Sequence, residues 1–188
     1  MIELKTVYFS RSNEEATEMT LKLAHQRAEE LGIKTIVVAS TTGKTAVQAT
    51  EVCRASKIIA VSHVMGMREP NILDFTDKNR ELVEAAGGRV LTAAHAFSGL
   101  SAAMRLKYHT YSLGDVVANS LRVLGQGVKV CCEITLMAAD AGLIRTDEDI
   151  ISVGGSASGA DTAMVLTPAL SRHFFDLKVK EILCKPHM

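Results

Sequence analysis

The stretch Ile33–Val47, IKTIVVASTTGKTAV, constrains this chain more than any other part of its sequence. The apolar and β-branched residues from Ile36 to Ala39 predict a short strand that is buried on both faces. A hydroxyl-rich loop, Ser40–Thr45, follows at once, and helix-forming residues resume directly after it. Such a loop can hold a phosphate, because backbone N–H groups, hydroxyls and the positive end of a helix dipole point to one place. The alternative interpretation is an ordinary helix cap made by serine and threonine.

This loop does not match the phosphate-binding motif of P-loop nucleotide triphosphatases. The Gly-Lys-Thr at 43–45 resembles the end of that motif, but Val38 stands where its first glycine is required. The next predicted strand, Lys57–His63, ends in histidine rather than in the aspartate that binds magnesium in that class. We therefore do not expect a nucleotide triphosphatase of this kind.

Strand and helix patterns alternate through the first half of the chain. A first strand is predicted at Lys5–Ser10, and a helix follows with Ser12 at its N-cap, Glu15 in a capping box and Gly32 as its stop. Further elements are predicted at Thr45–Ala55 (helix), Lys57–His63 (strand), Phe75–Ala86 (helix) and Arg89–Ala93 (strand). This alternation favours a parallel sheet covered by helices on both faces.

The second half of the chain begins with helices and returns to strands. Helices are predicted at Ser98–Leu106, Leu113–Leu124 and Val128–Gly142, and strands at Ile150–Val153, Thr162–Thr167 and Phe174–Cys184, the last as a candidate edge strand. No repeat or linker divides the sequence. We therefore expect a single α/β domain over residues 1–188.

The composition of the chain limits the classes of partner and the cellular compartment that we expect for it. Lys and Arg number 21, as do Asp and Glu, and no basic run stands out, so nucleic acid is not expected as a partner. No apolar run reaches the roughly 18 residues of a membrane span, and no signal-peptide pattern is present. The four cysteines lack metal-site spacing and fit reduced thiols. We expect a cytoplasmic protein without a metal site.

Two separated stretches resemble the C-terminal α/β domain of pyruvate kinases, and the whole chain is similar to free-standing, archaeal-type homologues of that domain. The stretches are TIVVASTTGKTAVQATEVCRASKIIAVSH and DEDIISVGGSASGADTAMVLTP. The resemblance implies a three-layer α/β/α sandwich with a mostly parallel, mixed sheet whose last strand runs antiparallel. The catalytic barrel of a pyruvate kinase takes about 250 residues by itself. The 188 residues cannot contain one, so kinase activity is not expected.

The resemblance also implies a ligand. In regulated pyruvate kinases the matching loop holds a phosphate of a sugar-bisphosphate effector, a role that would fall here on Ser40, Thr41, Thr42, Gly43 and Thr45. The Gly-rich loop at Gly155–Gly159 would close over the same pocket. The free-standing homologues resemble binders of flavin mononucleotide (FMN), which makes FMN the favoured cofactor. A regulatory module that senses a sugar phosphate without catalysis is the alternative.

Ligands of parallel α/β sheets lie beyond the carboxyl ends of the strands, and this rule selects further candidate residues. Besides Lys44 in the phosphate loop, these candidates are Ser10, Asn13, His63, His95, Gly155, Ser156, Ser158, Gly159 and Asp161. Each has a structural alternative. The histidines could be exposed loop residues, the glycines could serve a tight connection, Asp161 could order its own turn, and Ser10 and Asn13 could be helix caps.

Two other features stay open at this level. Glu133 interrupts an apolar helix, so it is either a site residue or the partner of a lysine or arginine in a salt bridge. The aromatic residues of Lys107–Ser112 could cover a planar ligand or could belong to a plain loop. No catalytic residue is assigned. The expected partner is a phosphorylated small molecule, with a homo-oligomer as the default assembly.

Overall fold

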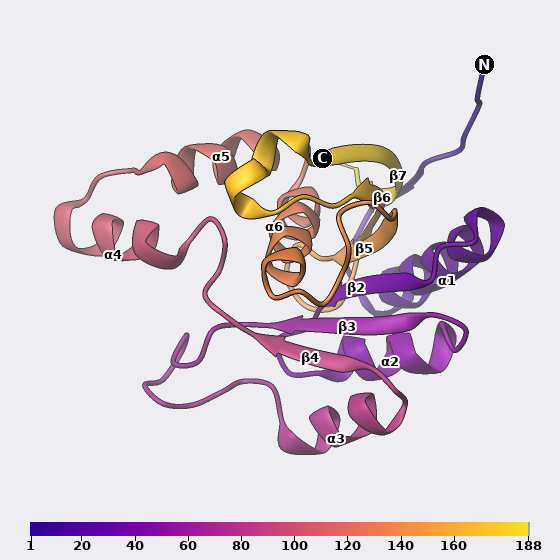
Figure 1. The fold of residues 1–188 in the computed structure, drawn as a ribbon, viewed down its shortest axis with the longest axis horizontal. Coiled ribbons are helices and arrows are strands. Elements are labelled where there is room, and N and C mark those ends of the chain that lie inside the picture. The colour runs from indigo at the N-terminus through magenta and orange to yellow at the C-terminus, as the bar shows by residue number, and fades with distance from the viewer. Residues whose placement is uncertain (188) are drawn as a thin grey trace.

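The computed structural model describes residues 1–187, and seven strands in this range form one sheet (Figure 1). The elements in chain order are β1 (Val7–Phe9), α1 (Glu14–Leu31), β2 (Thr35–Ala39), α2 (Lys44–Val52), β3 (Lys57–Ser62), α3 (Asp77–Ala85), β4 (Arg89–Thr92), α4 (Gly99–Tyr108), α5 (Leu113–Arg122), α6 (Gln126–Asp140), β5 (Ile150–Gly154), β6 (Thr162–Thr167), the 3-10 helix η1 (Ser171–Asp176) and β7 (Lys178–Pro186). Every element predicted from the sequence is present, with its ends shifted by a few residues.

The sheet is mixed, in the order β1-β7-β6-β5-β2-β3-β4. β2 pairs in parallel with β3 and β5, β3 with β4, and β1 with β7, whereas β6 runs antiparallel to both of its neighbours. The expectation that the last strand runs antiparallel is therefore wrong. The short turn after β5 forces β6 to reverse, and η1 then turns the chain again, so that β7 returns to the common direction.

Helices cover both faces of the sheet, as the fold class requires. On one face, Val37, Ile59 and Val61 pack against α5, α6 and the residues of η1. On the other face, strand residues of opposite parity such as Ile36 and Val38 pack against α1 and α2, and α3 joins the far end of this layer (Figure 1). Alternate side chains of one strand thus enter two different cores, which explains why β2 is apolar throughout.

The start of α1 differs from the predicted capping box. Asn13, not Ser12, is the N-cap, and its side chain accepts a hydrogen bond from the Ala16 N–H at 2.9 Å. The Ser12 hydroxyl is directed away and donates to the Asp161 carboxylate at 2.6 Å. The predicted stop is confirmed, because Gly32 ends the helix with a φ of +67°.

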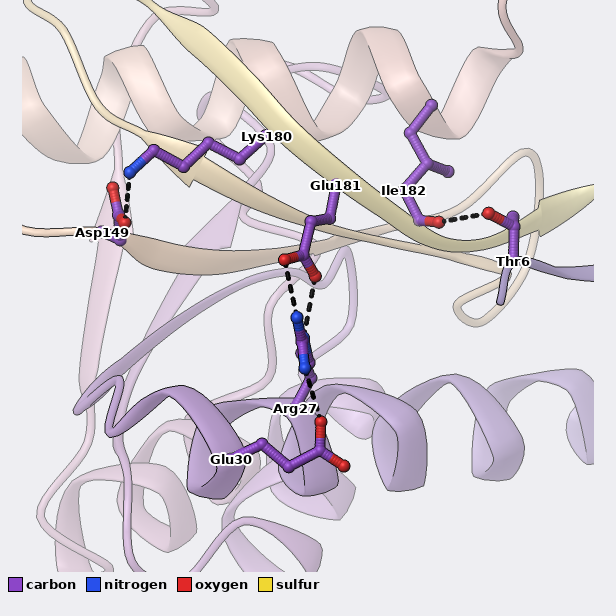
Figure 2. A network of polar contacts seen from close by, with 7 residues as sticks. All are labelled: Thr6, Arg27, Glu30, Asp149, Lys180, Glu181 and Ile182. Carbon is purple, nitrogen blue, oxygen red and sulfur yellow. Dashed lines mark hydrogen bonds and ion pairs between the residues drawn. The ribbon is translucent and has the colours of Figure 1, made fainter. Parts of the chain in front are cut away.

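The sequence made the last strand a candidate edge strand, but in the structure it does not lie at an edge. β7 lies between β6 and β1, and η1 occupies the first residues of the stretch predicted as strand. Arg27 of α1 holds β7 through two hydrogen bonds of 2.8 and 2.7 Å to Glu181, and it also donates to Glu30 (Figure 2). Lys180 pairs with Asp149 before β5 (Figure 2). These contacts attach the end of the chain to both α1 and the middle of the sheet.

The cysteines are free thiols, as expected, and all four are buried in the cores. Burial raises the pKa of the Cys132 thiol to about 12 and that of the Cys53 thiol to about 11. Within residues 1–187, no helix has the length and apolar character needed to cross a bilayer.

Candidate functional site

One large cleft lies beyond the carboxyl ends of the parallel strands. Its volume is about 1110 Å³, and the segments that follow β1, β2, β3, β4 and β5 all contribute to its walls. β2 continues to β3 on one side and has β5 on the other, so the strand order reverses between the loops after β2 and β5. A crevice at such a reversal is where open α/β sheets bind ligands.

The loop after β2 presents the start of α2 to this cleft. Gly43 is the N-cap, with a φ of +94°, and a Cβ at this position would lie 2.5 Å from the Cβ of Asn79. The Ser40 hydroxyl, three residues before this N-cap, accepts a hydrogen bond from the Ala46 N–H at 3.3 Å, so a serine of the loop satisfies one N–H group of the first turn although it is not the N-cap residue. Within the described residues, the N–H groups of Lys44 and Thr45 donate no hydrogen bond, so capping leaves donors for an anion.

Basic residues outnumber acidic residues around the cleft. Its lining includes five cations (Lys44, Arg68, Arg105, Arg122, Lys129) and three carboxylates (Glu14, Asp115, Glu133), an excess of two positive charges on a chain of zero formal net charge. Lys44 and Glu14 form an exposed ion pair of 3.0 Å between the starts of α2 and α1. The cleft therefore favours an anionic ligand.

Two helices of the β4–β5 connection complete the outer wall. Arg105 of α4 pairs with Asp115 of α5, whose carboxylate also accepts the Ser112 N–H at 3.1 Å. The hydrogen bond from Ser112 holds the pKa of Asp115 below its usual value. Arg122, at the end of α5, donates to the amide oxygens of Asn119 and Gln126 at 2.7 Å each. Among residues 1–187, Arg122 therefore has no carboxylate as a hydrogen-bond partner.

The Gly-rich loop after β5 is held to α1 by Asp161. This carboxylate is 1% exposed and accepts hydrogen bonds from the Ser12 hydroxyl, the Ser156 N–H (2.9 Å) and the Thr162 hydroxyl (2.8 Å). The Thr17 hydroxyl adds a 3.0 Å bond from the Ala160 N–H. These contacts favour the ordering role of Asp161 that the sequence left as an alternative, since its oxygens already have protein partners.

The inner wall holds two histidines and a buried ion pair. The rings of His63 and His95 pack edge to face with their centres 5.5 Å apart, and His63 Nε2 lies 3.3 Å from the Thr41 hydroxyl oxygen. On α6, Lys129 pairs with Glu133, which also accepts the Phe97 N–H at 3.0 Å. Burial lowers the pKa of His95 more than the nearby Glu133 raises it, so the imidazole is uncharged at neutral pH.

Most of the predicted site residues line this cleft. The lining includes Asn13, Ser40, Thr41, Thr42, Lys44, Thr45, His63, His95, Gly155, Ser156, Ser158 and Gly159. Ser10, Gly43 and Asp161 do not line it; Ser10 is exposed at the end of β1. Of the two interpretations of Glu133, both apply in part, since it forms a salt bridge and also lines the cleft. Tyr111 is the only tyrosine among the described residues that lines the cleft.

Sequence reasoning missed the cationic residues of α5 and α6. Arg122 and Lys129 lie in helices that precede β5, outside the strand-end loops that the parallel-sheet rule selects. One signal could have found Lys129, because it stands four residues before Glu133 in an apolar helix and so faces the same side. Among residues 1–187, no group of three or more His, Cys, Asp or Glu side chains is placed to hold a metal ion.

Comparison with known proteins places this architecture in a family. Residues 18–166 match the family model described as the pyruvate kinase α/β domain. Two crystal structures of pyruvate kinase from Cryptosporidium parvum are similar, with 14% and 13% identity and TM-scores of 0.46 and 0.42. Each match covers 85% of this chain and 24% of the other, so the chain spans about a quarter of the length of those enzymes. With well over half of its residues matched by the family model, the chain belongs to the pyruvate kinase α/β-domain family.

Proposed function

We propose that this protein binds a phosphorylated small molecule in the cleft, with its phosphate on the Ser40–Thr45 loop and with FMN as the favoured ligand. The observation that carries the proposal is the start of α2. Its Lys44 and Thr45 N–H groups lack partners among the described residues and open into a cleft with an excess of positive charge. Hydroxyls of the same loop supply further donors to a phosphate.

The remainder of the cleft is compatible with a flavin. Its volume of about 1110 Å³ slightly exceeds the usual range of about 300–1,000 Å³ for small-molecule sites, so a ligand of flavin size can fit. Val61, Phe97, Ile134 and Met137 offer apolar and aromatic contacts near the histidines. Thr42, Lys44 and Thr45 would hold the phosphate, and these apolar residues would face the ring. A bound flavin would supply hydride or electron transfer. That this chain is an archaeal-type, free-standing member of its family also stays a prediction.

The absorbance spectrum of the purified protein and the mass of any released ligand test the favoured ligand. Isothermal titration with FMN and with inorganic phosphate follows, on the wild type and on Thr42→Ala/Lys44→Ala. The double variant should lose at least about ten-fold in affinity for both, because it removes a hydroxyl and a charge from the phosphate. Thr50→Ala/Lys78→Ala is the matched control, since both residues lie on α2 and α3 outside the cleft.

Two results would contradict parts of this proposal separately. A colourless protein that takes up no FMN would exclude FMN as the ligand and would leave the proposed phosphate site untouched. Unchanged phosphate affinity in Thr42→Ala/Lys44→Ala would exclude the loop as the anion site.

A sugar-bisphosphate sensor is the second candidate, and Arg122 favours it. This guanidinium bonds only to amide oxygens among the described residues, so it could take a second phosphate. Arg122→Gln should then weaken the binding of a hexose bisphosphate about ten-fold more than that of the corresponding hexose monophosphate. Equal loss for both sugars would contradict this role.

A further inference from the structure

We propose that Lys129, held by Glu133, is a second ligand anchor in the cleft and binds an uncharged oxygen, a carbonyl or hydroxyl, at the end of the ligand remote from its phosphate. This inference deepens the proposed function and rests on it. It concerns the inner wall, formed by His63, His95 and the Lys129–Glu133 pair of α6.

Glu133 is fixed in place by protein contacts. Its side chain is 6% exposed, one oxygen accepts the Phe97 N–H at 3.0 Å, and the other accepts the Lys129 ammonium. Each carboxylate oxygen therefore has a donor from a different segment, the β4–α4 loop and α6. A carboxylate held in this way orients its lysine partner rather than contacting the ligand itself.

Lys129 has donors to spare. Its ammonium carries three N–H donors, and Glu133 is its single hydrogen-bond partner among residues 1–187. The side chain is only 7% exposed, and the ammonium lies 5.8 Å from the centre of the Phe97 ring. Donors in so buried a position cost free energy unless an acceptor meets them. Because Lys129 lines the cleft, that acceptor can belong to a ligand.

Charge distinguishes this wall from the rim of the cleft. The excess of two positive charges comes from the outer part of the cleft, here called the rim, where Lys44, Arg68, Arg105 and Arg122 outnumber Glu14 and Asp115. Arg68 also pairs at 3.6 Å with Asp74, which lies outside the lining, so an excess of one charge remains at the rim. On the inner wall Lys129 and Glu133 offset each other, and burial keeps His95 uncharged at neutral pH. An anionic group is therefore favoured at the rim and the phosphate loop, and an uncharged polar group at the inner wall.

Polar side chains of the cleft lead from the phosphate loop toward the inner wall. Thr41 of the phosphate loop contacts His63 at 3.3 Å, and the His63 ring packs on His95. His95 lines the same cleft and stands two residues before Phe97, whose N–H donates to Glu133. A ligand with its phosphate on the loop thus extends along the histidines toward Lys129. The ligand class is a phosphomonoester whose remote end carries a carbonyl or hydroxyl oxygen.

The test measures the affinities of four probes for the full chain by isothermal titration. Inorganic phosphate engages only the loop, riboflavin only the remote end, and FMN and ribose 5-phosphate both. At least one of the two phosphomonoesters should bind about ten- to hundred-fold more tightly than phosphate, the range expected for one hydrogen bond from a charged group.

Two variants locate this gain. Lys129→Met should lower this gain by at least about ten-fold and leave phosphate affinity within about two-fold. Because Lys129→Met leaves the Glu133 charge buried and unpaired, Lys129→Met/Glu133→Gln is measured alongside it. In the double variant neither replaced side chain is charged, and the new glutamine keeps an acceptor for the Phe97 N–H. Lys178→Met, on β7 outside the cleft, is the control for loss of a lysine.

Three results would overturn the anchor. These are a wild type that binds both phosphomonoesters no more tightly than phosphate, a gain retained in Lys129→Met/Glu133→Gln, or an equal loss of affinity in Lys178→Met. Failure of the loop looks different. If the protein binds no phosphate but still binds riboflavin in a way that depends on Lys129, the phosphate site is wrong and the Lys129 anchor is retained.

Discussion

Replacing Asp161 tests whether one buried carboxylate holds the Gly-rich loop against α1. In Asp161→Ala three donors lose their acceptor at once: the hydroxyls of Ser12 and Thr162 and the N–H of Ser156. Ser12 and Ser156 are exposed residues, so water can replace the carboxylate as their partner, whereas Thr162 is fully buried. A buried donor left without a partner costs about 1–3 kcal/mol, so the Thr162 hydroxyl alone predicts a loss of about 1–3 kcal/mol in the free energy of unfolding.

Urea denaturation followed by circular dichroism measures this loss, with a second variant as reference. Asp161→Asn keeps one oxygen for Ser12 and Ser156 and turns its amide toward the Thr162 hydroxyl, which can accept, so a smaller loss of about 0.5–1.5 kcal/mol is expected. An Asp161→Ala protein within about 0.5 kcal/mol of the wild type would refute the reasoning. If the folded Asp161→Asn protein instead loses more than about ten-fold in FMN affinity, Asp161 contacts the ligand, the other interpretation of its sequence.

Three further outcomes follow from buried groups. Burial lowers the pKa of His95 in the folded protein below 6.5, so as the pH falls the imidazole of the unfolded chain is protonated first. The neutral imidazole therefore contributes fully to stability above about pH 6.5, and this contribution is lost as the pH falls toward the folded pKa. The urea midpoint should consequently fall less between pH 7.5 and pH 5 in His95→Gln than in the wild type. Gly159→Ala should destabilise by at least about 1 kcal/mol in thermal denaturation, since φ is +80° and the new Cβ would lie 2.3 Å from the Thr17 hydroxyl; an unchanged melting temperature would contradict this. Thiol titration at pH 8 should detect the four cysteines only after unfolding, since burial raises the pKa of Cys53 to about 11 and of Cys132 to about 12; rapid labelling of the folded protein would show open access instead.

The local elements of this fold could be predicted because their signals are local. A buried strand needs a short apolar run, and β2 has one from Ile36 to Ala39. Gly32 ends α1 because a helix that stops in the left-handed region favours a residue without a side chain. The rule that parallel strands bind ligands at their carboxyl ends then selected the loops that line the cleft.

The cap of α1 shows where local signals compete. Ser12 and Asn13 are both good caps, and the sequence favoured Ser12 because Glu15 stands three residues later. The structure uses Asn13, since Ser12 is engaged by Asp161, which is 149 residues away. A contact at such sequence separation changes the choice and leaves no local trace.

Tertiary structure alone decided the place of β7 within the sheet and the approach of Arg122 and Lys129 to the cleft. A strand pattern states which side chains are buried, but not which neighbours supply the burial, so β7 could not be placed between β6 and β1. Arg122 and Lys129 reach the cleft because the long β4–β5 connection crosses back over β3 and β2 and lays α5 and α6 beside the strand ends. The sequence by itself determined the hydroxyl-rich loop between β2 and α2, because a strand, a short turn and a helix start have local signals. The opposite wall, with its buried lysine, exists only through the packing of segments that are far apart in the chain.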